Sequence, residues 1–324
     1  MEFAIEKVVS WFPTVLACLC YCYFISSIIP KGFFRLFSLL PIFYLFIILP
    51  LNIPSVIITA TSTLFLISLI NSNPVPLGSS SNSIETEPNR TPDHSSQPPK
   101  PAKKLPFLSY IGLELVLLAV LIGVVLSYRD KYHPKILLVL YCCLVLLSVD
   151  CIGGASNFLS YAIIGLELEL PSNKPYLSTS LQDFWGKRWN LRVTNALRRT
   201  IYNPVRTVYA VLLGKSLARL VAVLTTFLVS GLFHELFFYY LTRAKPTWEM
   251  TSFFVLHGFC VALEVAVKKG LKREWSLSRW ISGPLTIGFV MLTSFWLFFP
   301  PLTRSSVDTV VLEEFRTFGE LVHN

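Results

Sequence analysis

One apolar stretch carries two ionisable residues in its interior, and it constrains the fold more than any other part of the chain. The segment LVAVLTTFLVSGLFHELFFYYL runs from Leu220 to Leu241, and a helix of about 20 residues is long enough to cross a bilayer. His234 and Glu235 stand side by side two thirds of the way along it. Ionisable groups at this depth are costly unless they face a protein interior or a wet cavity, so they mark a candidate functional site.

His234 is the candidate base of this site, because histidine can take and return a proton near neutral pH. The alternative is a packing histidine bonded to a neighbouring helix, and this stretch alone leaves both open. Ser230 lies one turn earlier on the same helix face and could bond to the ring in either case. Adjacent helix positions point about 100° apart, so we expect Glu235 to bond to another helix rather than to His234.

Composition places the chain among polytopic all-α membrane proteins. Hydrophobic residues make up 53% of the 324 and charged residues 15%. The seven cysteines follow no metal-ligand spacing and are expected to behave as small apolar residues, so no metal site is predicted. Apolar windows predict about eight membrane spans, at 9–29, 34–50, 52–70, 107–127, 136–156, 217–241, 251–267 and 281–300.

The segments between these spans suggest how the chain is organised. Residues 1–70 are expected to form N-terminal transmembrane helices, and the Pro-, Ser- and Asn-rich residues 71–106 a disordered cytosolic linker. A catalytic membrane domain over 107–301 follows, with a cytosolic loop at 171–207 and a C-terminal tail over 302–324. The segment 154–170 is predicted to be a helix that lies on or re-enters the membrane.

Lysine and arginine are unevenly divided between alternate loops. The first, third, fifth and seventh loops hold 18 of them and the other side holds 8, which places the odd-numbered loops in the cytosol. The sequon at Asn89 then faces the cytosol, and we expect it to be unglycosylated. The net charge of +9 is accounted for by positive loops and acidic lipid headgroups, without nucleic acid.

The fifth loop, PSNKPYLSTSLQDFWGKRWNLRVTNALRRTIYNPVR, interleaves seven basic residues with tryptophan and tyrosine. Such a surface could hold phosphates while aromatic faces accept an adenine ring, as binding of coenzyme A would need. The alternative is a juxtamembrane amphipathic helix that contacts anionic lipid. Asn190 and Asp183 are the polar residues there that could best orient a reacting group.

The blocks SLQDFWGKRWNLRVTNALRRTIYNPVR and VSGLFHELFFYY, about 30 residues apart, closely resemble the plant wax synthase branch of the membrane-bound O-acyltransferases. The similarity covers roughly Leu105 to Pro301, and before Leu105 the chain enters its Ser/Pro segment directly where related chains carry further apolar sequence. The resemblance implies a multi-pass enzyme of the endoplasmic reticulum that transfers a fatty acyl group from acyl-CoA to a lipid hydroxyl. It implies no cofactor besides acyl-CoA as substrate, and it makes His234 and Asn190 the catalytic residues.

The residues suit this chemistry. An imidazole can take the proton of the attacking hydroxyl, and an amide such as that of Asn190 can stabilise the oxyanion. The loop residues expected to bind substrate are Asp183, Trp185, Lys187, Arg188 and Trp189. His257 is a lesser candidate, for which we expect a packing or acceptor-orienting role.

The lipid acceptor and the class of the protein each have alternatives. The acceptor is expected to be a long-chain alcohol, giving a wax ester, with a sterol or diacylglycerol as the alternatives. A proton-coupled transporter could use the same intramembrane His and Glu, but no internal repeat is visible. The sequence contains no His-x-x-x-Asp pair and no Gly-x-Ser-x-Gly elbow. Gly214-Lys215-Ser216 is not a phosphate loop, because position 209 is Tyr.

Overall fold

A computed structural model describes residues 105–129, 131–164, 172–270 and 278–323, together with isolated positions between 10 and 28. The predictions for the spans 34–50 and 52–70, for nearly all of the linker 71–106 and for the sequon at Asn89 lie outside these residues. The span 9–29 is described only at isolated positions.

The described chain forms seven helices of six or more residues outside the basic loop. They are α4 (Leu105–Tyr128), α5 (Pro134–Ile164), α8 (Asn203–Thr242), α9 (Glu249–Gly270), α10 (Arg279–Thr293), α11 (Phe299–Arg304) and α12 (Val307–His323). The π-helical turn η5 (Ser294–Phe298) joins α10 to α11.

Four helical segments within the described residues are long and apolar enough to cross a membrane. They are Pro134–Ala155, Leu191–Thr242, Glu249–Lys268 and Arg279–Arg304, and the shorter apolar helix Gly112–Tyr128 precedes them. Each overlaps a predicted span, although Leu191–Thr242 begins well before the predicted start at residue 217. The helical membrane character of the chain is therefore confirmed over its second half. The count of eight spans stays a prediction.

Helix α5 differs from its predicted shape. It continues without a break from Pro134 to Ile164, so the described part of the segment 154–170 is helical, as expected, and extends the helix of the preceding span. The physical reason is that no proline follows Pro134 until Pro171, so nothing removes a backbone donor from the helical hydrogen-bond ladder.

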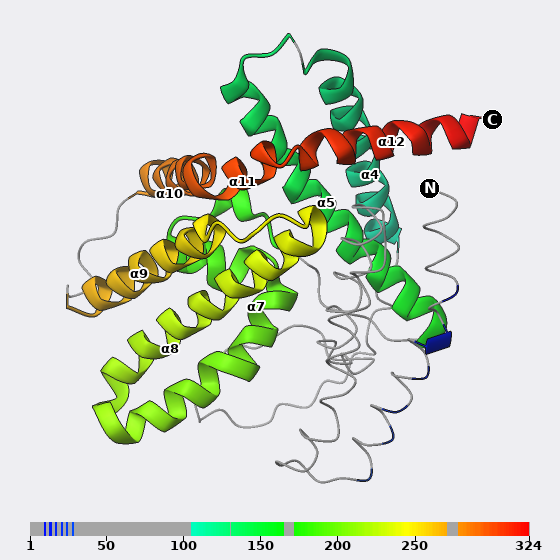
Figure 1. Cartoon of the computed structure of the whole chain (residues 1–324). Coiled ribbons are helices and arrows are strands. Elements are labelled where there is room, and N and C mark those ends of the chain that lie inside the picture. The colour runs from blue at the N-terminus through cyan, green and yellow to red at the C-terminus, as the bar shows by residue number, and fades with distance from the viewer. Residues whose placement is uncertain are drawn as a thin grey trace, which may run out of the picture.

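Helix α8 contains a sharp turn at Gly214. This residue has φ 76° and ψ 160°, a conformation that only glycine adopts without strain. The chain folds back there, at the lower left of Figure 1. The second arm of α8 carries His234 and then runs beside α9 (Figure 1).

Two glycines let α8 and α9 approach each other closely, as small residues do in membrane helices. A Cβ built on Gly231 would lie 2.9 Å from the Cα of Thr251, and one built on Gly258 would lie 2.8 Å from the Cβ of Phe227. The backbones of the two helices therefore meet near His234.

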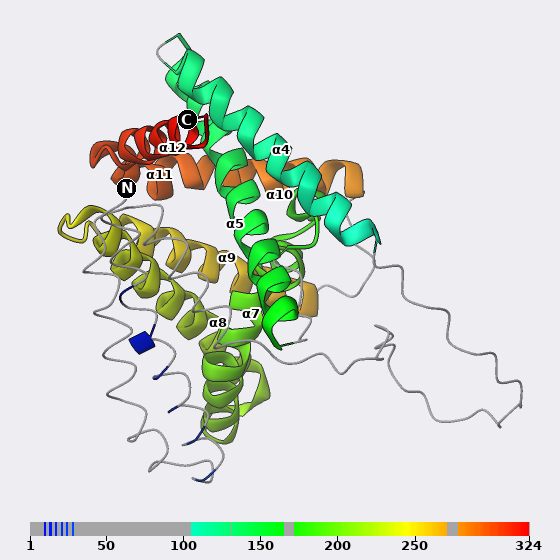
Figure 2. The ribbon, with the colours of Figure 1, turned by 90° about the vertical axis from the view of Figure 1, so that its right-hand side faces the viewer.

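The predicted C-terminal tail contains helix α12, which crosses α4 in Figure 1 and lies at the upper left of Figure 2, beside the upper part of α5. A cluster of buried side chains joins these elements: Val125, Tyr141, Phe299 and Leu312. The Tyr141 hydroxyl donates to Asp308 at 2.8 Å, and Arg129 pairs with the same carboxylate at 3.4 Å.

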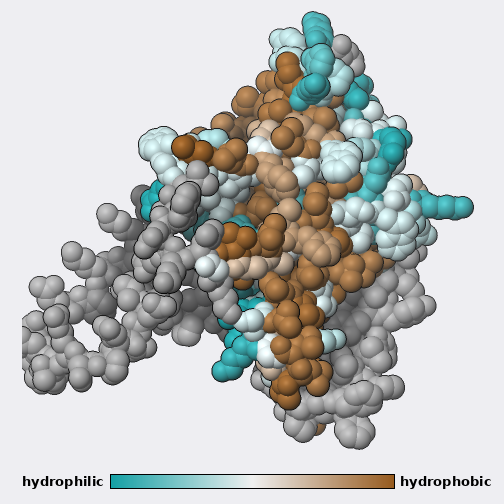
Figure 3. All heavy atoms as spheres, turned by 90° about the vertical axis from the view of Figure 1, so that its left-hand side faces the viewer, coloured by the Kyte–Doolittle hydropathy of each residue, from teal (hydrophilic) through white to brown (hydrophobic). Residues whose placement is uncertain are grey.

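Large apolar side chains face outward over much of the surface. A continuous hydrophobic band runs from top to bottom of the face drawn in Figure 3. Trp280 is 90% exposed, Val211 87% and Leu292 68%. A surface this apolar fits contact with lipid rather than water.

Candidate active site

The basic loop is folded into short helical turns. These are η2 (Pro175–Leu177), α6 (Leu181–Asp183), η3 (Phe184–Arg188), α7 (Leu191–Leu197) and η4 (Arg198–Tyr202). The Ser180 hydroxyl accepts a hydrogen bond from the backbone N–H of Asp183 at 3.1 Å, which caps the start of α6. The loop is therefore an ordered structure and not a single amphipathic helix.

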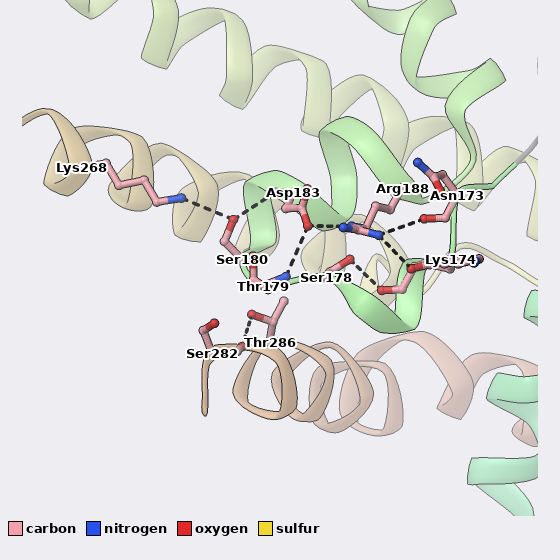
Figure 4. Close-up of polar contacts among 11 residues, drawn as sticks. Asn173, Lys174, Ser178, Thr179, Ser180, Asp183, Arg188, Lys268, Ser282 and Thr286 are labelled. Carbon is pink, nitrogen blue, oxygen red and sulfur yellow. Dashed lines mark hydrogen bonds and ion pairs between the residues drawn. The ribbon is translucent and has the colours of Figure 1, made fainter. Parts of the chain in front are cut away.

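Asp183 and Arg188 form an ion pair that shapes this loop (Figure 4). The Arg188 Nε donates to Asp183 Oδ2 at 2.7 Å, and that oxygen also accepts from the Thr179 N–H at 3.3 Å. The other end of the guanidinium donates to the carbonyls of Asn173 and Lys174 at 3.3 and 3.4 Å. Both side chains are thus engaged with the loop itself.

Asn190 has a left-handed backbone, with φ 38° and ψ 64°, a conformation that asparagine tolerates better than most residues. Its Oδ1 accepts from the backbone N–H of Val193 at 3.4 Å and caps α7. The carboxamide is therefore oriented by its oxygen. Its nitrogen makes no hydrogen bond within the described residues.

An aromatic cluster holds the loop against α8 and α9. Trp185 lies across the rings of Phe227 and Phe254, with ring centroids 5.7 and 5.6 Å apart. Trp189 stacks on Phe184, with centroids 5.8 Å apart and 9° between the planes. Lys187 is exposed.

His257 lies at the centre of this cluster and is completely buried. The indole Nε1–H of Trp185 donates to its Nδ1 at 3.0 Å, and its Nε2 is 2.9 Å from the Thr293 hydroxyl. Both ring nitrogens are thus occupied. This agrees with the predicted packing or orienting role.

His234 is arranged differently. Its Nδ1 lies 2.7 Å from the backbone carbonyl oxygen of Ser230. A carbonyl only accepts, so Nδ1 carries the hydrogen and Nε2 keeps its lone pair. The ring stacks on Phe254, with centroids 4.2 Å apart and 33° between the planes. Ser230 does bond to the ring as expected, but through its carbonyl and not its hydroxyl.

The side chain of His234 is only partly buried, and Nε2 has no hydrogen-bond partner among the described residues. Of the two histidines in described spans, His234 alone has a ring nitrogen that makes no hydrogen bond to the described residues. The lone pair of this nitrogen is chemically able to accept a proton.

Glu235 points away from His234. It is 4% exposed, and its Oε1 accepts from the backbone N–H of Thr251 at 3.3 Å, in the first turn of α9. The prediction that Glu235 bonds to another helix is confirmed. A carboxylate at a helix N-terminus is also favoured by the helix dipole.

The structure links some of the predicted site residues and separates others. Trp185 and His234 contact the same ring, that of Phe254. No hydrogen bond joins Asn190 to His234 in the described part of the chain. Phe254 and Thr293 belong to the site, but the sequence did not single them out. Phe254 could have been found because it precedes His257 by three residues on one helix face, whereas Thr293 carries no such signal.

Comparison with known proteins places the chain in a family. Residues 170–256 match the model of the membrane bound O-acyl transferase family. The long-chain-alcohol O-fatty-acyltransferase of Simmondsia chinensis is 39% identical, with 96% of this chain and 95% of that protein covered.

Two relatives from Arabidopsis thaliana carry different names. The probable long-chain-alcohol O-fatty-acyltransferase 9 is 38% identical, with 93% of this chain and 91% of that protein covered. The acyl-CoA-sterol O-acyltransferase 1 is 34% identical, with 94% and 93% covered. The chain therefore belongs to the membrane bound O-acyl transferase family, in the branch of the plant long-chain-alcohol O-fatty-acyltransferases.

Proposed function

We propose that this acyltransferase moves a fatty acyl group from acyl-CoA to a long-chain alcohol, forming a wax ester, with His234 as the general base. The free Nε2 lone pair of His234 carries the proposal, because a base must have an unprotonated nitrogen that substrate can reach. The relatives named for long-chain alcohols support the choice of acceptor.

The reaction follows from this arrangement. Nε2 takes the proton of the alcohol hydroxyl as the oxygen attacks the thioester carbonyl carbon. The tetrahedral intermediate expels the coenzyme A thiolate, and the imidazolium returns its proton to that sulfur. The Nδ1–H bond to the Ser230 carbonyl supports the imidazolium through both steps, since that nitrogen donates in either state.

Asn190 is proposed to donate to the carbonyl oxygen of the thioester. Its oxygen is held by the Val193 N–H, which leaves its NH2 group to face a ligand. A positioned donor of this kind typically contributes about 3 kcal/mol to catalysis.

The loop supplies a proposed surface for acyl-CoA on the cytosolic side. Exposed Lys187 is the cation placed to meet phosphates. Asp183 and Arg188 contribute by holding the loop in shape, and Trp185 and Trp189 form its aromatic face. The enzyme is proposed to reside in the endoplasmic reticulum, where its lipid substrates partition into the bilayer.

A sterol is the second candidate acceptor, because a relative 34% identical over most of the chain is named for that substrate. The hydroxyl chemistry at His234 would be the same. The choice between acceptors depends on the shape of the apolar pocket.

One assay tests both the reaction and the base. The full chain and its His234→Ala variant are expressed in microsomes of a yeast that lacks its own sterol and diacylglycerol acyltransferases. Labelled palmitoyl-CoA is supplied with hexadecanol, sterol and diacylglycerol, and the neutral lipids are resolved. A labelled wax ester is expected from the wild type and not from His234→Ala.

The matched control is His133→Ala, since His133 is exposed at the turn between α4 and α5 and should be dispensable for the reaction. Ester formation that survives in His234→Ala would overturn the assignment of the base. A labelled sterol ester in place of the wax ester would favour the second acceptor.

A further inference from the structure

His257 is outside the residues that the proposed reaction uses, yet it is 0% exposed. A polar ring is stable at such a site only when its nitrogens are paired. The structure pairs both of them, with side chains from two other elements. The ring therefore connects α9 to two other elements.

The hydrogen-bond directions can be assigned from the chemistry of the partners. Indole only donates, so Nδ1 of His257 is the acceptor and carries no hydrogen. Its Nε2–H then donates to the Thr293 hydroxyl, and that hydroxyl donates to the Phe289 carbonyl at 2.8 Å. The neutral ring in one tautomer satisfies every member of the chain.

This relay joins the loop to the membrane helices. Trp185 comes from η3, His257 from α9 and Thr293 from α10. Two turns further along α9, on the same face, Glu264 accepts from the backbone N–H of Gln182 at 3.1 Å. Helix α9 therefore holds the loop at two points, and the one at His257 is buried.

The buried point is also linked to the base. The ring of Phe254, one turn before His257, contacts both Trp185 and His234, with ring centroids 5.6 and 4.2 Å away. A shift of the indole would therefore move the ring against which His234 is oriented. Packed aromatic interiors transmit such shifts because they contain few voids.

We propose that His257 is a positioning residue for the acyl transfer. By accepting the Trp185 N–H it fixes the indole, which in turn holds Phe254 against the ring of His234. This inference rests on the proposed function, since it assigns His257 a role in orienting the base of that reaction.

Two substitutions separate the two hydrogen bonds of His257. In His257→Asn the short side chain can place its oxygen near the Nδ1 position and accept from Trp185, but it does not reach Thr293. In His257→Gln the longer side chain reaches Thr293 but presents no acceptor at the Nδ1 position. Glutamine is nearer to histidine in volume, so a packing role and a positioning role predict opposite orders.

Turnover is measured on the full chain in detergent with saturating palmitoyl-CoA and hexadecanol. We expect kcat of His257→Asn to stay within about threefold of wild type and kcat of His257→Gln to fall about tenfold, the size of an effect that one lost buried hydrogen bond produces. Equal losses in the two variants, or a larger loss in His257→Asn, would overturn the proposal.

Thermal unfolding of the same proteins supplies a readout that needs no activity. Trp185→Phe removes the donor that His257→Gln leaves unpaired. It should recover much of the melting temperature lost in His257→Gln and none of that lost in His257→Asn. Additive losses in both pairs would overturn the proposal. A wild type that melts as expected but forms no ester would instead refute the proposed function.

Discussion

Two histidines in described membrane spans differ in how their nitrogens are used. Both ring nitrogens of His257 bond to side chains. In His234 only Nδ1 forms a hydrogen bond, to a backbone carbonyl. The difference is one of hydrogen-bond partners rather than of residue type. It decides which ring can act on a substrate and which can only hold its neighbours.

The proposed role of Asn190 depends on one group, its side-chain NH2, which a single substitution can replace. Aspartate tolerates the same left-handed backbone and caps a helix as well as asparagine does, so Asn190→Asp should keep α7 and the loop intact. It replaces the NH2 donor with a carboxylate oxygen. We expect kcat to fall about 100-fold or more, as when an oxyanion donor is removed.

The control for this change is Asn203→Asp, which adds the same charge at an exposed position at the start of α8. Its kcat should stay close to that of wild type, and both variants should melt within a few degrees of it. Full activity in Asn190→Asp would show that the amide does not stabilise the oxyanion.

At the scale of elements, the site depends on how closely α8 and α9 pack. Gly231 faces the backbone of Thr251, one turn before His234 and opposite the residue that Glu235 caps. The contact is between backbones, so a larger side chain there cannot be accommodated by a rotamer change. The helices have to separate.

Gly231→Ala should therefore destabilise the protein by about 1–3 kcal/mol and lower kcat, because His234 shifts relative to Phe254. Gly288→Ala in α10 is the matched control, since a Cβ there meets nothing within 4 Å. The control should be neutral or slightly stabilising, because alanine has the higher helix propensity. Melting temperature and kcat of the two variants test this, and equal behaviour would contradict it.

At the scale of the whole molecule, the charge asymmetry of the loops predicts an orientation in the membrane. Arg198 lies in the basic loop, and Lys245 lies in the connection between α8 and α9. Both are exposed. The prediction places Arg198 in the cytosol and Lys245 in the lumen.

Cysteine labelling in sealed microsomes checks this orientation. Arg198→Cys should react with a membrane-impermeant maleimide at once, and Lys245→Cys only after the membrane is permeabilised. Native cysteines give the background, measured in the unmodified chain. The reverse labelling pattern would place the basic loop, and with it the proposed acyl-CoA surface, in the lumen.

The sequence by itself determined the class of the protein and the main parts of its site. Apolar segments of spanning length predicted the helices that became α4, α5, α9, α10 and the long arm of α8, because a bilayer leaves few other ways to satisfy backbone hydrogen bonds. The isolated His234 and Glu235 were visible because ionisable residues at that depth are rare.

Only the tertiary structure decided what each polar residue does. It paired Asp183 with Arg188 within the loop, turned Glu235 toward α9 and placed Trp185 on His257. It also continued α5 past residue 154 and showed a helix in the tail. Local sequence sets the period of a helix and its apolar surface. Hydrogen-bond partners come from elements distant in the chain, and they were set by the close approach of α8 and α9 and the folding of the loop against them.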